Sequence, residues 1–262
     1  MASLTHSAVA ANATHHIPAN FSIYNNDFLN ILGSTPKLEV LLENNDYPFA
    51  HEASVYIPSL ESLFMSSNMF TDPITKEKTI KVTKVSINAH PVTSEIINST
   101  IPMANGGVNH EGGILWAAQG TFNETGGLFQ MSAQPPYKSE LIVGDFHGRQ
   151  FNSVNDVVVA NDGSFWFTDP IYAWKQGIRP KPKLPNQVYR YDPVTKDVRV
   201  IADGFGRPNG ITFSPDEKIV YITDTAETNG DGSEDLTQPA TMYVMNMLRG
   251  PSLLSRGFGC QR

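Results

Sequence analysis

The sequence has little of several features that would point to particular classes of protein. It has one cysteine, Cys260, which excludes an internal disulfide framework and a thiolate metal site. Charged residues make up only 17% of the 262 residues, and the 40% hydrophobic content is enough for a packed core, so the chain is not of the disordered class. No run of about 18 apolar residues occurs, so no membrane-spanning helix is predicted. The net charge of −7 argues against nucleic acid or a membrane surface as partner.

The features of a secretory signal are also missing. Residues 1–20 contain no basic stretch followed by an apolar one. Four Asn-x-Ser/Thr sequons, which can accept glycans in secreted proteins, nonetheless occur at Asn12, Asn20, Asn98 and Asn123. Because such tripeptides also arise by chance, the sequence leaves open whether the protein is secreted or cytoplasmic, and it leaves the oligomeric state open. We expect residues 1–35 to form an irregular lead-in with a short helix over 27–32.

From about residue 36 the chain consists of short β-type segments between turn residues, without a helical period. The clearest hairpin joins 157–160 to 164–168 through Asn161-Asp162-Gly163, because Asp-Gly favours a tight turn that needs positive φ. Further strands are predicted at 54–57, 63–66, 79–87, 114–118, 127–131, 187–191, 198–201, 211–213 and 219–222. The sequence therefore predicts an all-β fold.

Two of these segments repeat one pattern. The segment from Asn155 to Asp169 and the segment from Asn209 to Asp224 both open with a polar loop residue, pass through a strand and a turn, and end in Thr-Asp. Similar units begin near Glu52 and Asn105, which gives a period of roughly 50 residues, typical of the four-stranded blades of a β-propeller. The sequence predicts about four blades over residues 36–247, followed by an atypical tail over 248–262.

In a propeller the innermost strands all begin at one face of the central channel, so the residues at their starts converge. Here those residues are Glu52, Asn155 and Asn209, with the stretch 105–109 contributing from the second unit. Carboxylate and amide oxygens favour a hard cation, calcium above all, with other divalent cations as alternatives. The simpler interpretation is that the two asparagines satisfy backbone groups of their own loops.

Three neighbouring residues are further candidates. His51 adjoins Glu52 and is a candidate catalytic proton shuttle, whereas Asp156 and Arg207 are candidates for substrate binding. Asp156 could instead orient Asn155, and Arg207 could be a solvated loop residue. The repeated Asp169 and Asp224 are expected to be structural. No Gly-x-Ser-x-Gly motif occurs, so a serine-hydrolase mechanism has no support.

The segments FNSVNDVVVANDGSFWFTDP and GFGRPNGITFSPDEKIVYITDT resemble the senescence-marker-protein/gluconolactonase (regucalcin-like) family. The HEASV loop at residues 51–55 is similar to that of its fungal-type lactonohydrolase branch. The resemblance implies a six-bladed propeller with one catalytic divalent cation, usually calcium, that opens lactone rings of sugar or related acids. It also implies that Glu52 and Asn209 are metal ligands, and that Asn155 binds the metal, or the substrate and its water.

The resemblance also implies a catalytic aspartate, which activates the attacking water or itself attacks, one blade after the Arg-Pro-Asn-Gly loop. No acidic residue follows Asp235 in this sequence. We therefore expect a chain truncated at its C-terminus. Two functions stay open: a calcium-dependent lactonase, which this chain would represent in inactive form, and a non-catalytic partial-propeller binding module.

Overall fold

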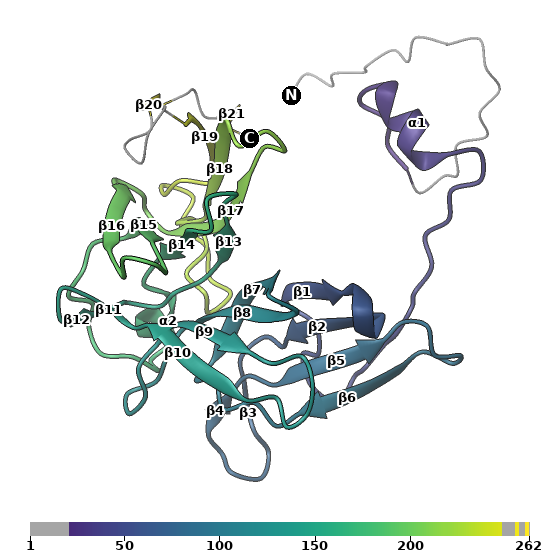
Figure 1. Cartoon of the computed structure of the whole chain (residues 1–262), viewed down its shortest axis with the longest axis horizontal. Helices are drawn as coiled ribbons and strands as arrows, with labels where there is room; N and C mark the ends of the chain where they lie inside the picture. The colour runs from purple at the N-terminus through teal and green to yellow at the C-terminus, as the bar shows by residue number, and fades with distance from the viewer. Residues whose placement is uncertain (1–20, 248–254, 257–259, 262) are drawn as a thin grey trace. The chain divides into compact units, whose positions relative to one another are not determined.

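The computed structural model describes residues 21–247, 255–256 and 260–261 (Figure 1). The chain divides into two units, residues 1–43 and 44–262. In the first unit the described residues form one helix, α1 (Asp27–Leu32), at the predicted place, and Gly33 ends it with a φ of 70°. Within the described part of the chain, no helix is long and apolar enough to cross a membrane. The sequons at Asn12 and Asn20 and most of the predicted tail lie outside the described residues.

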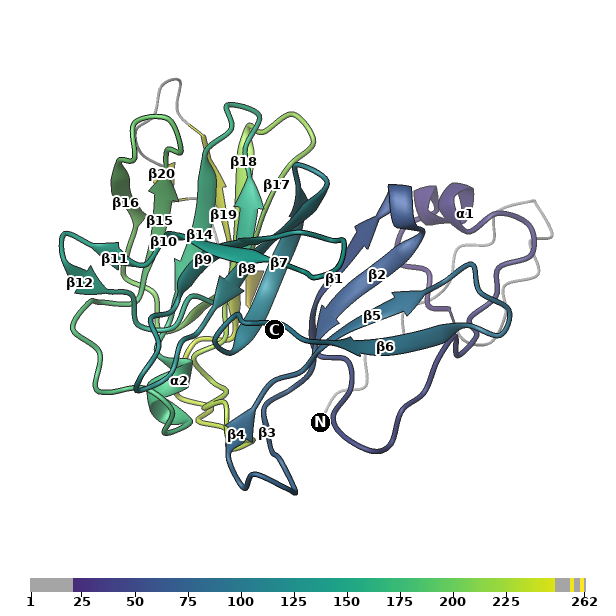
Figure 2. The same cartoon turned by 60° about the horizontal axis from the view of Figure 1, so that its bottom comes forward.

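The second unit consists of four antiparallel sheets whose strands follow one another in chain order (Figures 1 and 2). The first blade comprises β1 (Glu52–Ile57), β2 (Ser62–Ser66), β5 (Val82–Ser86) and β6 (Thr93–Ile97). The second comprises β7 (Ala104–His110), β8 (Gly113–Ala118), β9 (Gly127–Met131) and β10 (Ser139–Val143). The third comprises β13 (Val157–Val159), β14 (Phe165–Asp169), β15 (Gln187–Tyr191) and β16 (Val198–Ala202). The fourth comprises β17 (Pro208–Phe213), β18 (Ile219–Asp224) and β19 (Thr241–Asn246), with β20 (Ser255–Arg256) and β21 (Cys260–Gln261) both paired to β19. The predictions of an all-β fold and of four blades are confirmed.

Shorter elements lie between these strands. Two small hairpins are formed by β3 (Phe70–Thr71) with β4 (Lys78–Thr79) and by β11 (Asp145–Phe146) with β12 (Arg149–Gln150). A 3-10 turn, η1 (Pro58–Leu60), joins β1 to β2, and the helix α2 (Tyr172–Lys175) follows β14. The helix α2 was not predicted, because a single helical turn is too short to show a hydrophobic period.

Apolar clusters between successive blades fix their order. The strand β8 is buried along its whole length, and Trp116 on it packs between the first two blades. Between the second and third blades, Phe167 and Tyr189 stack with their ring centroids 5.5 Å apart. A further cluster between the third and fourth blades contains Trp166 and Ile222. The inner strands β1, β7, β13 and β17 contact one another in that order, so the starts of these strands face a common centre.

Candidate functional site

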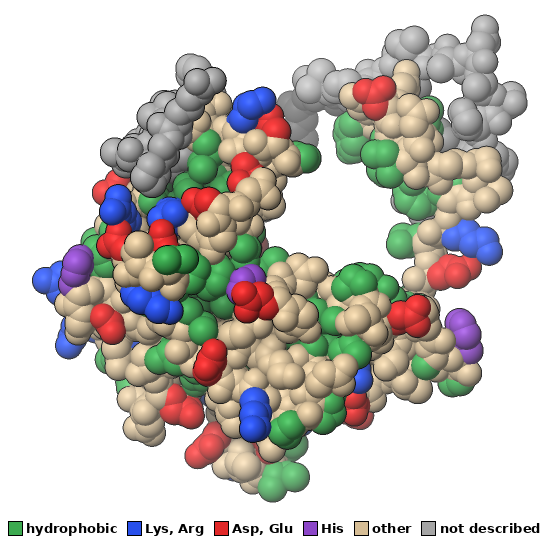
Figure 3. All heavy atoms as spheres, in the orientation of Figure 1, with side chains coloured by type: hydrophobic (Ala, Val, Ile, Leu, Met, Phe, Trp, Pro, Cys, Tyr) green, Lys and Arg blue, Asp and Glu red, His purple; other side chains and the backbone are tan. Residues whose placement is uncertain are grey.

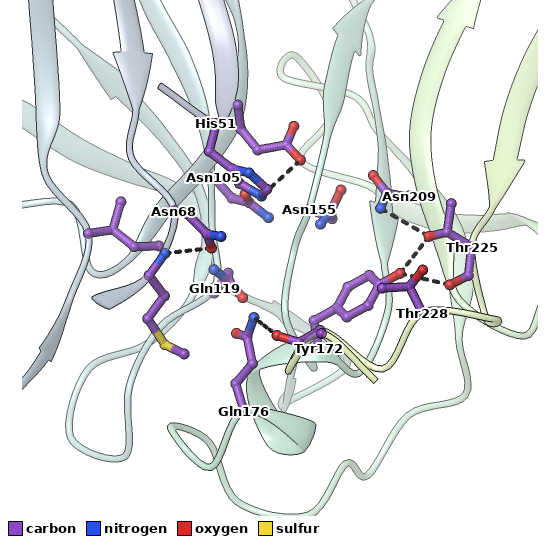
Figure 4. Close-up of a pocket in the computed structure, with 15 residues that line it drawn as sticks. His51, Asn68, Asn105, Gln119, Asn155, Tyr172, Gln176, Asn209, Thr225 and Thr228 are labelled. Carbon is purple, nitrogen blue, oxygen red and sulfur yellow. Dashed lines mark hydrogen bonds and ion pairs between the residues drawn. The ribbon is translucent and has the colours of Figure 1, made fainter. Parts of the chain in front are cut away.

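A cavity of about 350 Å³ lies where the four inner strands begin (Figure 4). Its walls come from all four blades, α2 and the loop between β18 and β19. The lining includes three of the residues singled out as metal ligands, Glu52, Asn155 and Asn209, together with His51. Further polar side chains on the walls are Asn68, Asn105, Gln119, Tyr172, Gln176, Thr225 and Thr228.

The inner strands are irregular where they reach the cavity. In three of the four blades the register between the first and second strand shifts within the first residues of the inner strand, between Glu52 and Val55, Ala104 and Gly107, and Pro208 and Ile211. In the first blade, Ala53 and Ser54 adopt positive φ angles of 69° and 51°. Such bulges turn a side chain out of the regular alternation of a strand. The inner strands of the first, second and fourth blades therefore share a distortion at the site, which the third blade lacks.

Hydrogen bonds between neighbouring blades hold the backbone of three asparagines at the cavity, Asn105, Asn155 and Asn209. In each case a donor from the preceding blade reaches the asparagine carbonyl: Ser66 Oγ to Asn105 O (2.8 Å), Gly106 N to Asn155 O (2.8 Å) and Thr168 Oγ1 to Asn209 O (2.6 Å). The positions of these asparagines are thus set by contacts across blades, and are not a property of isolated loops.

Two buried carboxylates support the loops that lead into the third and fourth inner strands. Asp169 accepts the backbone N–H groups of Asn152 (2.9 Å) and Ser153 (2.7 Å). Asp224 in the same way accepts those of Gly206 (2.7 Å) and Arg207 (2.8 Å). Burial raises the pKa of Asp169 to about 7, although these hydrogen bonds oppose the shift. Both aspartates have the structural role expected from their repeat.

The oxygen atoms at the cavity are only partly satisfied. Asn155 Oδ1 is buried and has no hydrogen-bond partner among the described residues. Leaving such an oxygen unpaired costs about 1–3 kcal/mol, which a ligand at that position would offset. The amide nitrogen of Asn209 donates to Thr225 Oγ1 (3.1 Å). This bond does not involve the amide oxygen of Asn209.

The charged groups at the cavity are His51 and Glu52, whose Nε2 and Oε1 atoms are 3.7 Å apart. Burial raises the pKa of Glu52 and lowers that of His51, so both shifts favour the neutral forms in the absence of a ligand. No group of three or more His, Cys, Asp and Glu side chains suited to a metal occurs among the described residues. The donor set is instead one carboxylate with amide oxygens, which fits calcium and does not fit zinc.

The other two predicted residues, Asp156 and Arg207, are not among the residues that line the cavity. Asp156 is half-buried, and its carboxylate accepts the backbone N–H groups of Val157 (2.8 Å) and Ile211 (2.9 Å). Burial raises the pKa of Asp156 to about 6. Arg207 is 7% exposed, so it is not a solvated loop residue; its guanidinium donates to Asn229 Oδ1 (2.6 Å) and to the carbonyl of Thr228.

Residues that the sequence analysis did not single out complete the site. The hydroxyl of Tyr172 pairs with Thr225 Oγ1 and donates to the Thr225 carbonyl (3.2 Å), and Gln176 reaches the loop of the fourth blade through Gly230 O (3.2 Å). Tyr172 lies on α2, Gln176 directly follows that helix, and Thr225 and Gly230 lie in the β18–β19 loop, outside the repeated segments. No motif in the sequence marks them; only the position of α2 beside the cavity does.

Comparison with known proteins shows which family shares these features. The family described as SMP-30/gluconolactonase/LRE-like matches residues 81–229, more than half of the chain. A lactonohydrolase of Aspergillus oryzae, oryL, is 29% identical over 217 residues, which cover 79% of this chain and 48% of that protein. The chain thus spans about half the length of this relative.

Solved structures agree in fold. A gluconolactonase from Xanthomonas campestris superposes with a TM-score of 0.61 at 22% identity, covering 80% of this chain and 62% of that one. A calcium-binding regucalcin from Agrobacterium tumefaciens superposes with a TM-score of 0.51 at 16% identity, covering 84% of this chain and 60% of that one. The structural neighbours are six-bladed propellers, of which the described chain shows four blades. The chain belongs to the SMP-30/gluconolactonase/LRE-like family.

Proposed function

We propose that this chain is the cation-binding part of a lactone hydrolase, with calcium held by Glu52, Asn155 and Asn209. The observation that carries the proposal is the buried, unpaired Oδ1 of Asn155 on a cavity that Glu52 and Asn209 also line. The names of two similar proteins, a lactonohydrolase and a calcium-binding regucalcin, support the substrate class and the ion. A lactone of a sugar or related acid is the proposed substrate.

A bound calcium ion would polarise the lactone carbonyl and stabilise the oxyanion that forms on attack. His51 lines the cavity and is the proposed acceptor of a proton from the attacking water, and burial lowers its pKa, which favours the neutral imidazole that this role needs. The water oxygen bonds to the carbonyl carbon as His51 takes the proton, and cleavage of the ring C–O bond then releases an alkoxide that takes this proton from His51 and gives the hydroxy acid.

In this proposal Asp156 and Arg207 act on the site through other residues. Asp156 ties the start of β13 to the backbone of Ile211 in β17, and so holds Asn155 relative to Asn209. Arg207 braces the loop at Thr228 and Asn229, which forms one wall of the cavity. Direct contact of either residue with substrate requires a displacement of these hydrogen bonds.

A non-catalytic binding module is the second candidate. It is favoured by one observation, that Glu52 is the only carboxylate among the described residues that line the cavity. A site with one carboxylate can hold a cation without supplying the second carboxylate that the family resemblance implies for catalysis.

A hydrolysis assay separates these candidates. The chain is mixed with glucono-δ-lactone or pantolactone, and acid release is followed with a pH indicator in calcium and in excess chelator. With His51 as the base in place of the aspartate that the resemblance implies, the lactonase proposal predicts for this chain a rate above the spontaneous one that the chelator abolishes and that Glu52→Gln lowers by about tenfold or more. The control is Glu111→Gln, an exposed glutamate outside the cavity lining. Calcium binding without turnover would support the binding module, and an undiminished rate in chelator would contradict the role of the cation.

A further inference from the structure

A second cavity, of about 360 Å³, differs from the first in its charge. It is lined by residues 148–152, which include β12 and the chain after it, and by residues 179–183, which follow α2. Four of the lining residues are cationic: Arg149, Arg179, Lys181 and Lys183. None of the lining residues is acidic. We call this cavity the basic pocket.

Three of its cations have no partner in the described part of the chain. Arg149, Lys181 and Lys183 are exposed, and their side chains make no ion pair or hydrogen bond there. Other cations outside the pocket form ion pairs, as Lys84 does with Glu95 and Lys218 with Asp216. In Figure 3, Lys and Arg side chains gather at the edge of the visible face over β11 and β12. In a chain of net charge −7, the basic pocket brings four cationic side chains together with no acidic residue in its lining, which favours an anionic ligand.

The fourth cation belongs to the framework of the pocket. Arg179 is 4% exposed, and its guanidinium donates to the carbonyls of Phe151 (2.7 Å), Thr121 (3.2 Å) and Glu124 (3.3 Å). It therefore joins the two segments that form the pocket and has little capacity left for a ligand.

The backbone on either side of the pocket is also held in place. The Asn152 side chain donates to Leu184 O (3.1 Å) and accepts from Leu184 N (3.4 Å), which closes the loop that carries both lysines. Pro180 and Pro182 flank Lys181 and restrict φ at those positions. The pocket thus combines a fixed backbone with three cationic side chains that are free to close on a ligand.

We infer that the basic pocket binds a small molecule through a phosphate or carboxylate group. The guanidinium of Arg149 can pair with such a group in a bidentate manner, and Lys181 and Lys183 supply point charges beside it. All lining residues lie in the second and third blades and their connections, so the pocket is formed within the described chain. The inference holds whether or not the chain hydrolyses lactones.

The test is calorimetric titration of the full chain with inorganic phosphate and, separately, with citrate at constant ionic strength. We expect saturable binding of one ion per chain. Binding of phosphate but not citrate would identify the ligand group as a phosphate, and binding of citrate but not phosphate would identify it as a carboxylate. Lys181→Gln/Lys183→Gln should raise the dissociation constant by about tenfold or more, since two charge-assisted contacts are lost. The control is Lys76→Gln/Lys138→Gln, which removes the same charge at exposed lysines outside the basic pocket.

Two results would overturn the inference. One is the absence of saturable binding of both probes, and the other is an equal weakening in the control variant, which would reveal a general charge effect. Thermal melts of each variant check the fold. Should the double lysine variant fail to fold, Arg149→Gln at an exposed position takes its place, with the same expected loss and the same control.

Discussion

At the scale of single residues, the orientation of each amide decides whether an oxygen or a nitrogen faces the cavity. Asn209 is oriented by Thr225, whose hydroxyl accepts its Nδ2–H and is itself paired with the hydroxyl of Tyr172. An amide without such a partner can rotate and present its nitrogen, which cannot bind a cation. Thr225 is therefore a positioning residue for Asn209.

Thr225→Val removes this hydroxyl with little change in shape. We expect calcium affinity to fall by about three- to tenfold, equivalent to the loss of roughly 1 kcal/mol of orienting hydrogen bond, and titration calorimetry measures it. Thr228→Val is the matched control, because Thr228 also lines the cavity but its hydroxyl bonds to none of the three oxygen donors. An unchanged affinity in Thr225→Val would show that Asn209 needs no such support.

Asp169 gives the stability of the protein a characteristic pH dependence. Its pKa is about 7 in the folded state and near 4 when unfolded, so the folded chain binds more protons between these values. The contribution of Asp169 to the free energy of unfolding should therefore be fully present below about pH 4. It should fall as the pH rises toward 7, by up to about 1.4 kcal/mol per pH unit.

Urea unfolding at pH 5, 6, 7 and 8 measures this slope. Asp156, with its pKa near 6, contributes in the same direction, whereas the lowered pKa of His51 opposes it. Comparing the wild type with Asp169→Asn isolates the effect of Asp169. The variant side chain cannot ionise, so its free energy of unfolding should change less with pH. A slope of the same steepness in both proteins would contradict the assignment.

At the scale of strands, the sequence predicted the middle strands of the blades better than the strands at their edges. The hairpins at β13–β14 and β17–β18 were predicted because apolar strand segments and turn residues coincide there. The edge strands β6, β7 and β10 were missed, as was β19. β6 has four exposed residues of five, so no face of it carries an apolar pattern that a sequence could show.

Gly106 marks the closest approach of two inner strands. A Cβ at this position would lie 2.6 Å from Asn155 O and 2.7 Å from Asp156 Oδ1, and the Gly106 N–H donates to that same carbonyl. We expect Gly106→Ala to destabilise the chain by about 1–3 kcal/mol, as for overpacking in a core, and to disturb Asn155 directly. Urea unfolding measures the change. Gly210→Ala, whose nearest contact would be 3.2 Å away at a side-chain hydroxyl, should cost less, and equal costs would contradict this account.

At the scale of the whole molecule, the period of the sequence was enough to predict which distant residues meet. Glu52, Asn155 and Asn209 line one cavity because each stands at the start of an inner strand. The period says nothing about segments inserted between strands, so the period alone could not place Tyr172 and Gln176 at the cavity. It also does not show which side chains at a strand start turn inward: neither Asp156 nor Arg207 is among the lining residues, and their contact with substrate stays a prediction.

The most direct measurement is a calcium titration of the chain by calorimetry, with wild type, Glu52→Gln and the exposed control Glu111→Gln side by side. The account predicts one saturable site per chain, weakened about tenfold or more by Glu52→Gln and unchanged by Glu111→Gln. Calcium at 100 times its dissociation constant should then stabilise the wild type by about 2.7 kcal/mol in the same samples. No saturable binding, or equal affinity in wild type and Glu52→Gln, would contradict the claim that these oxygens form a cation site.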